Sequence, residues 1–105
     1  MDNRLKKEKD FEKVFKKGQR AFSDTVTLYY LPADDFKVGF AVSKKHGKSV
    51  KRNRIKRLLR ESFRSFKLKD TQNFFFVIIP KVKEEYRLDL FKRDMNYIFR
   101  KIKVL

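Results

Sequence analysis

The sequence predicts an α+β fold, a two-layer α/β sandwich in which helices lie mainly on one face of a mixed sheet. Three features predict it: early β-branched and aromatic segments, a long amphipathic helix that separates them from a further apolar segment, and a helical pattern that closes the chain. With 105 residues, of which 41% are hydrophobic, the chain is expected to bury one modest core. We therefore expect residues 1–105 to form a single domain.

The N-terminal part predicts a short helix followed by strands. Apolar residues recur at helical steps over residues 5–17, and Gly18 is placed to end the helix. Residues 25–31 and 36–42 are rich in β-branched and aromatic side chains and are separated by a turn containing Pro and Asp, which predicts a β-hairpin. Phe22 is assigned to a short additional strand before them.

The C-terminal part predicts one strand and a long helix. Residues 74–80 form an apolar run typical of a central strand buried on both faces, and Pro80 closes it. Residues 85–104 carry apolar side chains at helical spacing. The expected order is helix, two or three strands, basic helix, strand, helix, and the general rule would make the crossover through the basic helix right-handed.

The basic helix carries most of the functional signal. Residues 44–67 hold eleven Lys or Arg and a single acid, Glu61. At 100° per residue, an apolar stripe centred on Ile55 and Leu59 lies opposite a polar row. The polar row consists of Asn53, Arg57, Arg60 and Arg64.

This charge pattern favours a polyanion as the partner. A solvated helix face usually mixes signs, whereas Lys56, Arg60 and Arg64 repeat the same charge at intervals of four residues and repel each other. The chain also has a formal net charge of +16. A charge of this size predicts salt-sensitive binding to nucleic acid.

Several kinds of chemistry are excluded or unsupported. There is no cysteine and only one histidine, His46, which excludes thiolate metal sites and paired-histidine catalysis. Residues 47–49 read Gly-Lys-Ser, but Val42 stands where a phosphate-binding loop needs its first glycine, so Ser49 is expected only to cap the basic helix. No catalytic residue is assigned and the metal ligands stay unknown. Without a signal peptide or an 18-residue apolar run, a cytoplasmic protein without membrane contact is expected.

The run KRNRIKRLLRE at 51–61, preceded by VGFAVSKKHGKSV, closely resembles the signature of bacterial ribonuclease P protein subunits. The segment DFEKVFKKG at 10–18 and the strand containing Tyr29 extend the resemblance over nearly the whole chain. It implies a catalytic RNA that removes the 5′ leader of precursor tRNA with Mg²⁺ held mainly by RNA. The small protein assists without an obligate protein partner. It also implies a left-handed βαβ crossover, in a fold of the ribosomal protein S5 domain 2-like type.

Site residues follow from the resemblance and from the helical face. Asn53, Arg57 and Arg60 are expected to point outward, whereas Arg52 and Arg54 flank the apolar stripe and either contact RNA or brace the helix. The free N–H groups at the helix start, with the lysines beside them, could hold a backbone phosphate. The predicted contacts to the catalytic RNA are Lys44, Lys45, Lys48, Arg52, Asn53, Arg54, Lys56, Arg57, Arg60 and Arg64.

The resemblance also implies a second site. Three aromatic residues, Phe11, Phe15 and Tyr29, match positions that in the family line a cleft for the single-stranded leader of precursor tRNA. Aromatic stacking accepts any base at about 1–3 kcal/mol each, which suits a leader of variable sequence. The alternative is that Phe11 and Phe15, one helical turn apart, simply fill the core.

Three other functions remain as alternatives. A ribosomal or ribosome-assembly RNA-binding protein would share the composition, and only the ordered signature argues against it. A factor that binds duplex DNA would usually need a dimer surface, which the sequence does not show. A stand-alone nuclease would need a carboxylate cluster, whereas the basic middle third offers only Glu61.

Overall fold

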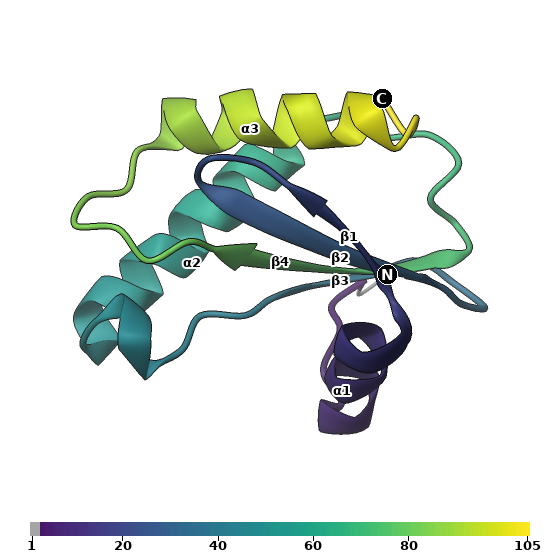
Figure 1. Ribbon diagram of the computed structural model, residues 1–105, viewed down its shortest axis with the longest axis horizontal. Coiled ribbons are helices and arrows are strands. Elements are labelled where there is room, and N and C mark those ends of the chain that lie inside the picture. Colours follow the sequence, from purple (N-terminus) through teal and green to yellow (C-terminus); the bar gives the residue numbers. More distant parts are fainter. Residues whose placement is uncertain (1–2) are drawn as a thin grey trace.

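A computed structural model describes residues 3–105 of the chain. Three helices and four strands follow one another in the order expected from the sequence, with the short first strand present (Figure 1). Their bounds are α1 (Glu8–Lys17), β1 (Gln19–Phe22), β2 (Val26–Pro32), β3 (Lys37–Phe40), the 3₁₀ turn η1 (Lys44–His46), α2 (Ser49–Arg64), β4 (Phe74–Pro80) and α3 (Leu88–Lys101).

The four strands form one mixed sheet in the order β1-β2-β4-β3. Strand β4 is antiparallel to β2 and parallel to β3, so its predicted central position is confirmed. The predicted hairpin of residues 25–31 with residues 36–42 is wrong, because β4 lies between β2 and β3. A strand that is apolar on both faces belongs in the interior of a sheet. Strand β4 therefore pairs with β2 along one edge and with β3 along the other. The hairpin partner of β2 is the short β1, with Gln19 opposite Tyr30.

Alternate residues of β4 face different layers. Phe76 and Ile78 are fully buried against α2 and α3, whereas Val77 belongs to a smaller cluster with Val14 of α1. Figure 1 shows α2 and α3 on one side of the sheet and α1 on the other. The prediction of helices mainly on one face is confirmed, and α1 covers part of the second face. The connection from β3 through α2 to β4 is the crossover whose left-handedness the resemblance implies.

The N-terminal segment covers the outer edge of β3. Val38 N–H donates to Asn3 O at 2.8 Å, and Leu5 N–H donates to Val38 O at 3.0 Å. At the start of α2, Lys48 is the N-cap and makes no side-chain hydrogen bond, so the expected cap by Ser49 is wrong. Ser49 is instead the first residue of the helix.

Helix α1 approaches the sheet closely through Phe11. Gly39 lies opposite Val77 in the register of β3 and β4, on the face that α1 covers. A Cβ atom at Gly39 would lie 2.5 Å from Cζ of Phe11 and 2.7 Å from its Cε1. The Phe11 ring therefore rests directly on the backbone of β3, in space that only glycine leaves open.

Gly39→Ala is expected to destabilise the protein by about 1–3 kcal/mol, because the added methyl group overpacks this contact. Urea unfolding measures the loss. Phe11→Leu removes the ring atoms that clash, so the cost of Gly39→Ala should shrink in that background. Additive costs of the two substitutions would contradict the contact.

Candidate nucleic-acid interface

Helix α2 divides into a buried and an exposed face as its periodicity predicts. Ile55, Leu59 and Ser62 are buried, and the Ser62 hydroxyl donates to Leu58 O at 2.8 Å, which satisfies its polar group. Asn53 and Arg57 are exposed on the opposite side. Of the predicted polar row, Asn53, Arg57 and Arg64 face solvent, whereas Arg60 is half-buried, contrary to its expected outward position.

The arginines of α2 differ in how they meet the rest of the protein. Arg54 is exposed, whereas Arg52 is half-buried and its Nε atom is buried without a hydrogen-bond partner in the part of the chain that the structure describes. Arg52 therefore packs against the protein, whereas the Arg54 side chain is exposed to solvent. Within residues 3–105, none of the following side chains forms an ion pair or hydrogen bond with another residue: Arg54, Lys56, Arg57, Arg60 and Arg64.

Two of these cations, Arg60 and Arg64, line a hollow beside α2. The hollow has a volume of about 610 Å³ and reaches from α2 across β3 to the N-terminal segment. Arg60 and Arg64 stand at its side, and the rings of Phe36 and Phe63 stack in its wall with centroids 6.3 Å apart. The cationic face thus continues into a concave surface large enough to receive part of a folded polyanion.

The predicted aromatic residues come together on the other face of the sheet. The ring centroids of Phe11 and Phe15 are 6.5 Å apart, and those of Phe15 and Tyr29 are 5.1 Å apart in an edge-to-face arrangement. Phe11 is half-buried on Gly39, which fits the core alternative, whereas Phe15 remains 39% exposed. The two phenylalanines therefore have different roles: Phe11 anchors α1, and Phe15 presents its ring at the surface.

Two residues of β1 that sequence reasoning missed extend this aromatic surface. Arg20 lies opposite Tyr29 in the strand register, and its Cζ atom is 6.0 Å from the Tyr29 ring centroid and 5.2 Å from that of Phe22. Phe22 is 51% exposed. Alternation within β1 puts Arg20 and Phe22 on one face, but only the pairing of β1 with β2 shows that this is the face of Tyr29.

A groove of about 270 Å³ continues from Tyr29 and Phe22. Its floor includes Ile79 of β4, and the exposed Lys45 and Lys81 also line it. The sequence predicts that Lys45, with Lys44 and Lys48, contacts the catalytic RNA, but in the structure Lys45 lines the groove beside Phe22 and Tyr29. We call the surface formed by Phe15, Arg20, Phe22, Tyr29, Lys45 and Lys81 the aromatic groove.

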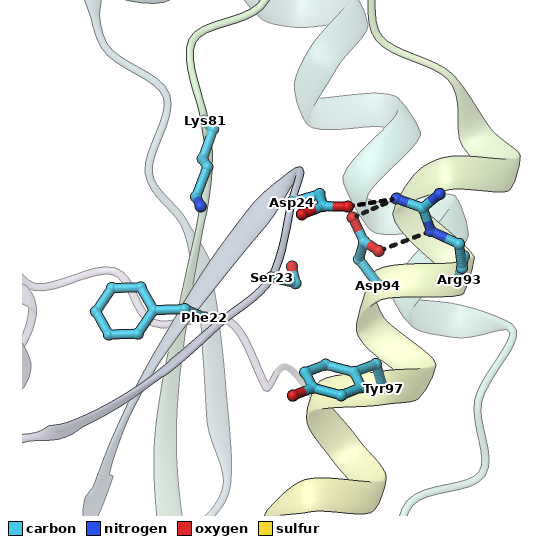
Figure 2. Close-up of a pocket in the computed structure, with 7 residues that line it drawn as sticks. All are labelled: Phe22, Ser23, Asp24, Lys81, Arg93, Asp94 and Tyr97. Carbon is cyan, nitrogen blue, oxygen red and sulfur yellow. Dashed lines mark hydrogen bonds and ion pairs between the residues drawn. The ribbon is translucent and has the colours of Figure 1, made fainter.

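A separate hollow of about 530 Å³ lies between the β1–β2 turn and α3, and a hydrogen-bonded group around Asp94 lines it (Figure 2). The buried Asp94 carboxylate accepts hydrogen bonds from Thr25 N–H at 2.9 Å and from the Thr25 hydroxyl at 2.5 Å. Arg93 donates to it from Nε at 2.9 Å and also lies 3.5 Å from Asp24. Burial alone would raise the pKa of Asp94, but the bonds from Arg93 and Thr25 together hold that pKa below its ordinary value.

Asp94→Asn is expected to destabilise the protein at neutral pH and to matter less in acid. Both Thr25 bonds end on Oδ2, so an Asn that keeps its oxygen there turns its NH₂ group toward the Arg93 Nε–H, and losing this hydrogen bond between charged groups costs about 1.5–3 kcal/mol. Because the folded-state pKa is depressed, this contribution is present above the unfolded pKa of about 3.9 and disappears as pH falls through the lower folded value. Urea unfolding of both proteins should therefore show a gap at pH 7 that narrows below about pH 4.

Asp89→Asn is the matched control, because Asp89 forms its ion pair with Arg87 on the surface of the same helix. That variant should stay within about 0.5 kcal/mol of the unchanged protein. A gap for Asp94→Asn that is independent of pH would contradict the assignment.

No helix in the described part of the chain has the length and apolar character to span a bilayer.

The mixed sheet, the cationic helix and the open aromatic groove define a class: a small α+β protein built to bind nucleic acid. Comparison with known proteins narrows this class. The family model described as ribonuclease P matches residues 1–103. The chain is 41% identical over 104 residues to the ribonuclease P protein component of Bacillus pumilus, covering 94% of this chain and 87% of the relative. It is 34% identical over 109 residues to the ribonuclease P protein component of Alkaliphilus metalliredigens, covering 99% of this chain and 96% of the relative.

Solved structures agree with this result. The RNase P protein of Staphylococcus aureus superposes with a TM-score of 0.81 at 26% identity, covering 99% of this chain and 98% of that one. The RNase P protein of Thermotoga maritima gives a TM-score of 0.75 at 27% identity, covering 92% and 96%. The chain belongs to the ribonuclease P protein family and is a protein subunit of that ribonuclease. The expected α+β fold is confirmed, and the match over nearly the whole chain sets the ribosomal alternative aside.

Proposed function

We propose that this protein binds the catalytic ribonuclease P RNA through α2 and the 5′ leader of precursor tRNA through the aromatic groove. In this way it assists Mg²⁺-dependent endonucleolytic removal of the leader, which yields the mature 5′ end of the tRNA. One observation carries the proposal: α2 packs on one face of the sheet and the aromatic groove lies on the other, so that one small protein offers two surfaces for RNA.

The α2 surface suits a folded RNA because its cations Arg54, Lys56, Arg57, Arg60 and Arg64 form no ion pair within residues 3–105. Arg57 and Arg64 are exposed, and the arginine guanidinium pairs with phosphate through two parallel hydrogen bonds. Neutralising phosphates releases counterions, so binding should weaken steeply as salt rises. Lys44 and Lys48, exposed in the loop before α2, extend the same positive surface.

The aromatic groove suits a single strand of variable sequence. The exposed ring of Phe15 and the half-buried ring of Tyr29 offer stacking surfaces that accept any base. Arg20, Lys45 and Lys81 supply positive charge for the sugar-phosphate backbone between the bases. Stacking combined with charge holds the leader without hydrogen bonds to base edges, as a variable leader requires.

Catalysis in this proposal belongs to the RNA. Residues 3–105 contain no group of three or more His, Asp or Glu side chains close enough to hold a metal ion. We therefore assign the Mg²⁺ ions to the RNA component and give this chain the task of binding and orienting the two RNAs. The proposal needs no further protein partner, and it places the protein in the cytoplasm, where bacterial precursor tRNA is made.

The proposal can be tested with precursor tRNAs that carry leaders of increasing length. Affinities are measured for the assembled protein–RNA complex and for the RNA alone, with mature tRNA as the reference ligand. The protein should raise the affinity for leader-bearing precursors more than for mature tRNA, and the gain should level off once the leader spans the groove. An equal gain for precursor and mature tRNA would contradict leader binding.

A further inference from the structure

The loop between β3 and α2 contains the chain's single histidine in an unusual position. Lys44 and Lys45 on its N-terminal side are exposed, but the His46 side chain is only 3% exposed. The sequence predicted no more than a loop histidine. Its burial within a basic loop shows that the imidazole is held by specific contacts.

Both ring nitrogens of His46 make hydrogen bonds, and these bonds determine the tautomer. The backbone N–H of Ser43 donates to Nδ1 at 3.0 Å, so Nδ1 must be unprotonated. The proton therefore sits on Nε2, which donates to the carbonyl oxygen of Pro80 at 2.7 Å. In return, the His46 backbone N–H donates to Ser43 O at 3.0 Å. The neutral imidazole thus closes its own loop and ties that loop to the end of β4.

The His46–Pro80 bond lies between the two lysines of the aromatic groove. Lys45 directly precedes His46, and Lys81 directly follows Pro80. Lys45, Pro80 and Lys81 line the same groove. Backbone hydrogen bonds hold the ends of β3 and β4 nearby, with Ala41 N–H donating to Ile78 O at 3.0 Å, and the His46–Pro80 bond is the side-chain contact that joins the two segments next to the lysines.

The segment that receives this bond is itself anchored. The hydroxyl of the buried Tyr86 donates to Lys81 O and accepts from Lys83 N–H, both at 2.9 Å. From the start of α2, Lys51 Nζ donates to Glu84 O at 3.2 Å and lies 5.7 Å from the Tyr86 ring centroid. His46 consequently fastens the basic loop to a segment that has hydrogen bonds of its own to Tyr86 and Lys51.

We propose that His46 is a positioning residue for the leader strand, an inference that rests on the proposed function of the groove. Its imidazole holds Lys45 beside Lys81 before RNA arrives, so that two positive charges already flank the path of the leader. A loop ordered in advance loses less conformational entropy when it binds. His46 itself does not touch the RNA and acts through Lys45.

The first test needs no RNA, because a single histidine gives unambiguous imidazole signals. Nitrogen-15 NMR of the folded protein at neutral pH should show a protonated Nε2 and an unprotonated Nδ1, with slow exchange of the Nε2 proton. Averaged tautomers with fast proton exchange would overturn the inference, since the bond to Pro80 would then not persist.

The second test is a double-mutant cycle of Lys45→Ala and His46→Ala in the assembled complex. The readout is the affinity for leader-bearing precursor divided by the affinity for mature tRNA. Each single variant should lower this ratio by about fivefold, roughly the loss of one backbone phosphate contact, and the double variant should be no worse than Lys45→Ala. His46→Gln can still donate to Pro80 O from the place of Nε2 and should retain most of the ratio.

Three outcomes would overturn the inference: a normal ratio for His46→Ala, fully additive losses in the double variant, or a loss of unfolding temperature with equal losses for precursor and mature tRNA. Phe15→Ala separates this failure from failure of the proposed function. If Phe15→Ala and Lys45→Ala lower the ratio and His46→Ala does not, only the positioning role is wrong. If neither Phe15→Ala nor Lys45→Ala lowers the ratio, leader binding by the groove is wrong as well.

Discussion

Replacement of Arg57 and Arg60 by Ala together is expected to weaken binding to ribonuclease P RNA at least a hundredfold at low salt, because each lost bond to a charged group is worth about 1.5–3 kcal/mol. Neither side chain has a partner within the described protein, so truncation leaves no protein group unsatisfied. The slope of log affinity against log salt should become shallower by about one unit for each lost phosphate contact. Titrations at several salt concentrations measure both quantities.

A matched variant, Arg100→Ala with Lys101→Ala, removes the same charge from the exposed end of α3. Its effect on affinity should be small, because the cationic face of α2 is left intact. An unchanged salt slope in the α2 variant, or equal losses in both variants, would show that the RNA senses only the net charge of +16.

Phe15→Ala is expected to weaken binding of leader-bearing precursor tRNA by about 1–3 kcal/mol, the value of one stacked base, and to leave binding of mature tRNA unchanged. The Phe15 ring is 39% exposed and touches Tyr29 edge-on, so its loss removes a surface and little core. Fluorescence anisotropy with the assembled complex measures both ligands.

Tyr97→Ala serves as the control, since Tyr97 is an exposed aromatic residue on α3, outside the groove. It should leave both affinities unchanged. Equal losses for precursor and mature tRNA after Phe15→Ala, or loss of the folded state, would instead assign Phe15 to the core.

The elements and the faces of α2 were predictable because they depend on local periodicity. The spacing of Ile55 and Leu59 identified the buried stripe, and the apolar run of β4 identified the central strand. Strand pairing was not predictable in the same way. The turn between β2 and β3 predicts a hairpin, but β4 inserts between these two strands and pairs with both.

The missed parts of the site depend on contacts between distant residues. Arg20 becomes part of the aromatic groove only through the register of β1 and β2, and the His46–Pro80 bond beside Lys45 joins residues 34 positions apart. Phe11 and Phe15 could not be separated by spacing alone. Their difference arises from Gly39, whose missing side chain makes room for the Phe11 ring.

The most direct test of the account is reconstitution. Purified protein, a bacterial ribonuclease P RNA and a leader-bearing precursor tRNA are mixed at low Mg²⁺ and physiological salt, and release of the 5′ leader is followed against RNA alone and protein alone. Efficient release of the leader is expected only when protein and RNA are both present. Cleavage by the protein alone, or no enhancement of the RNA by the protein, would contradict it.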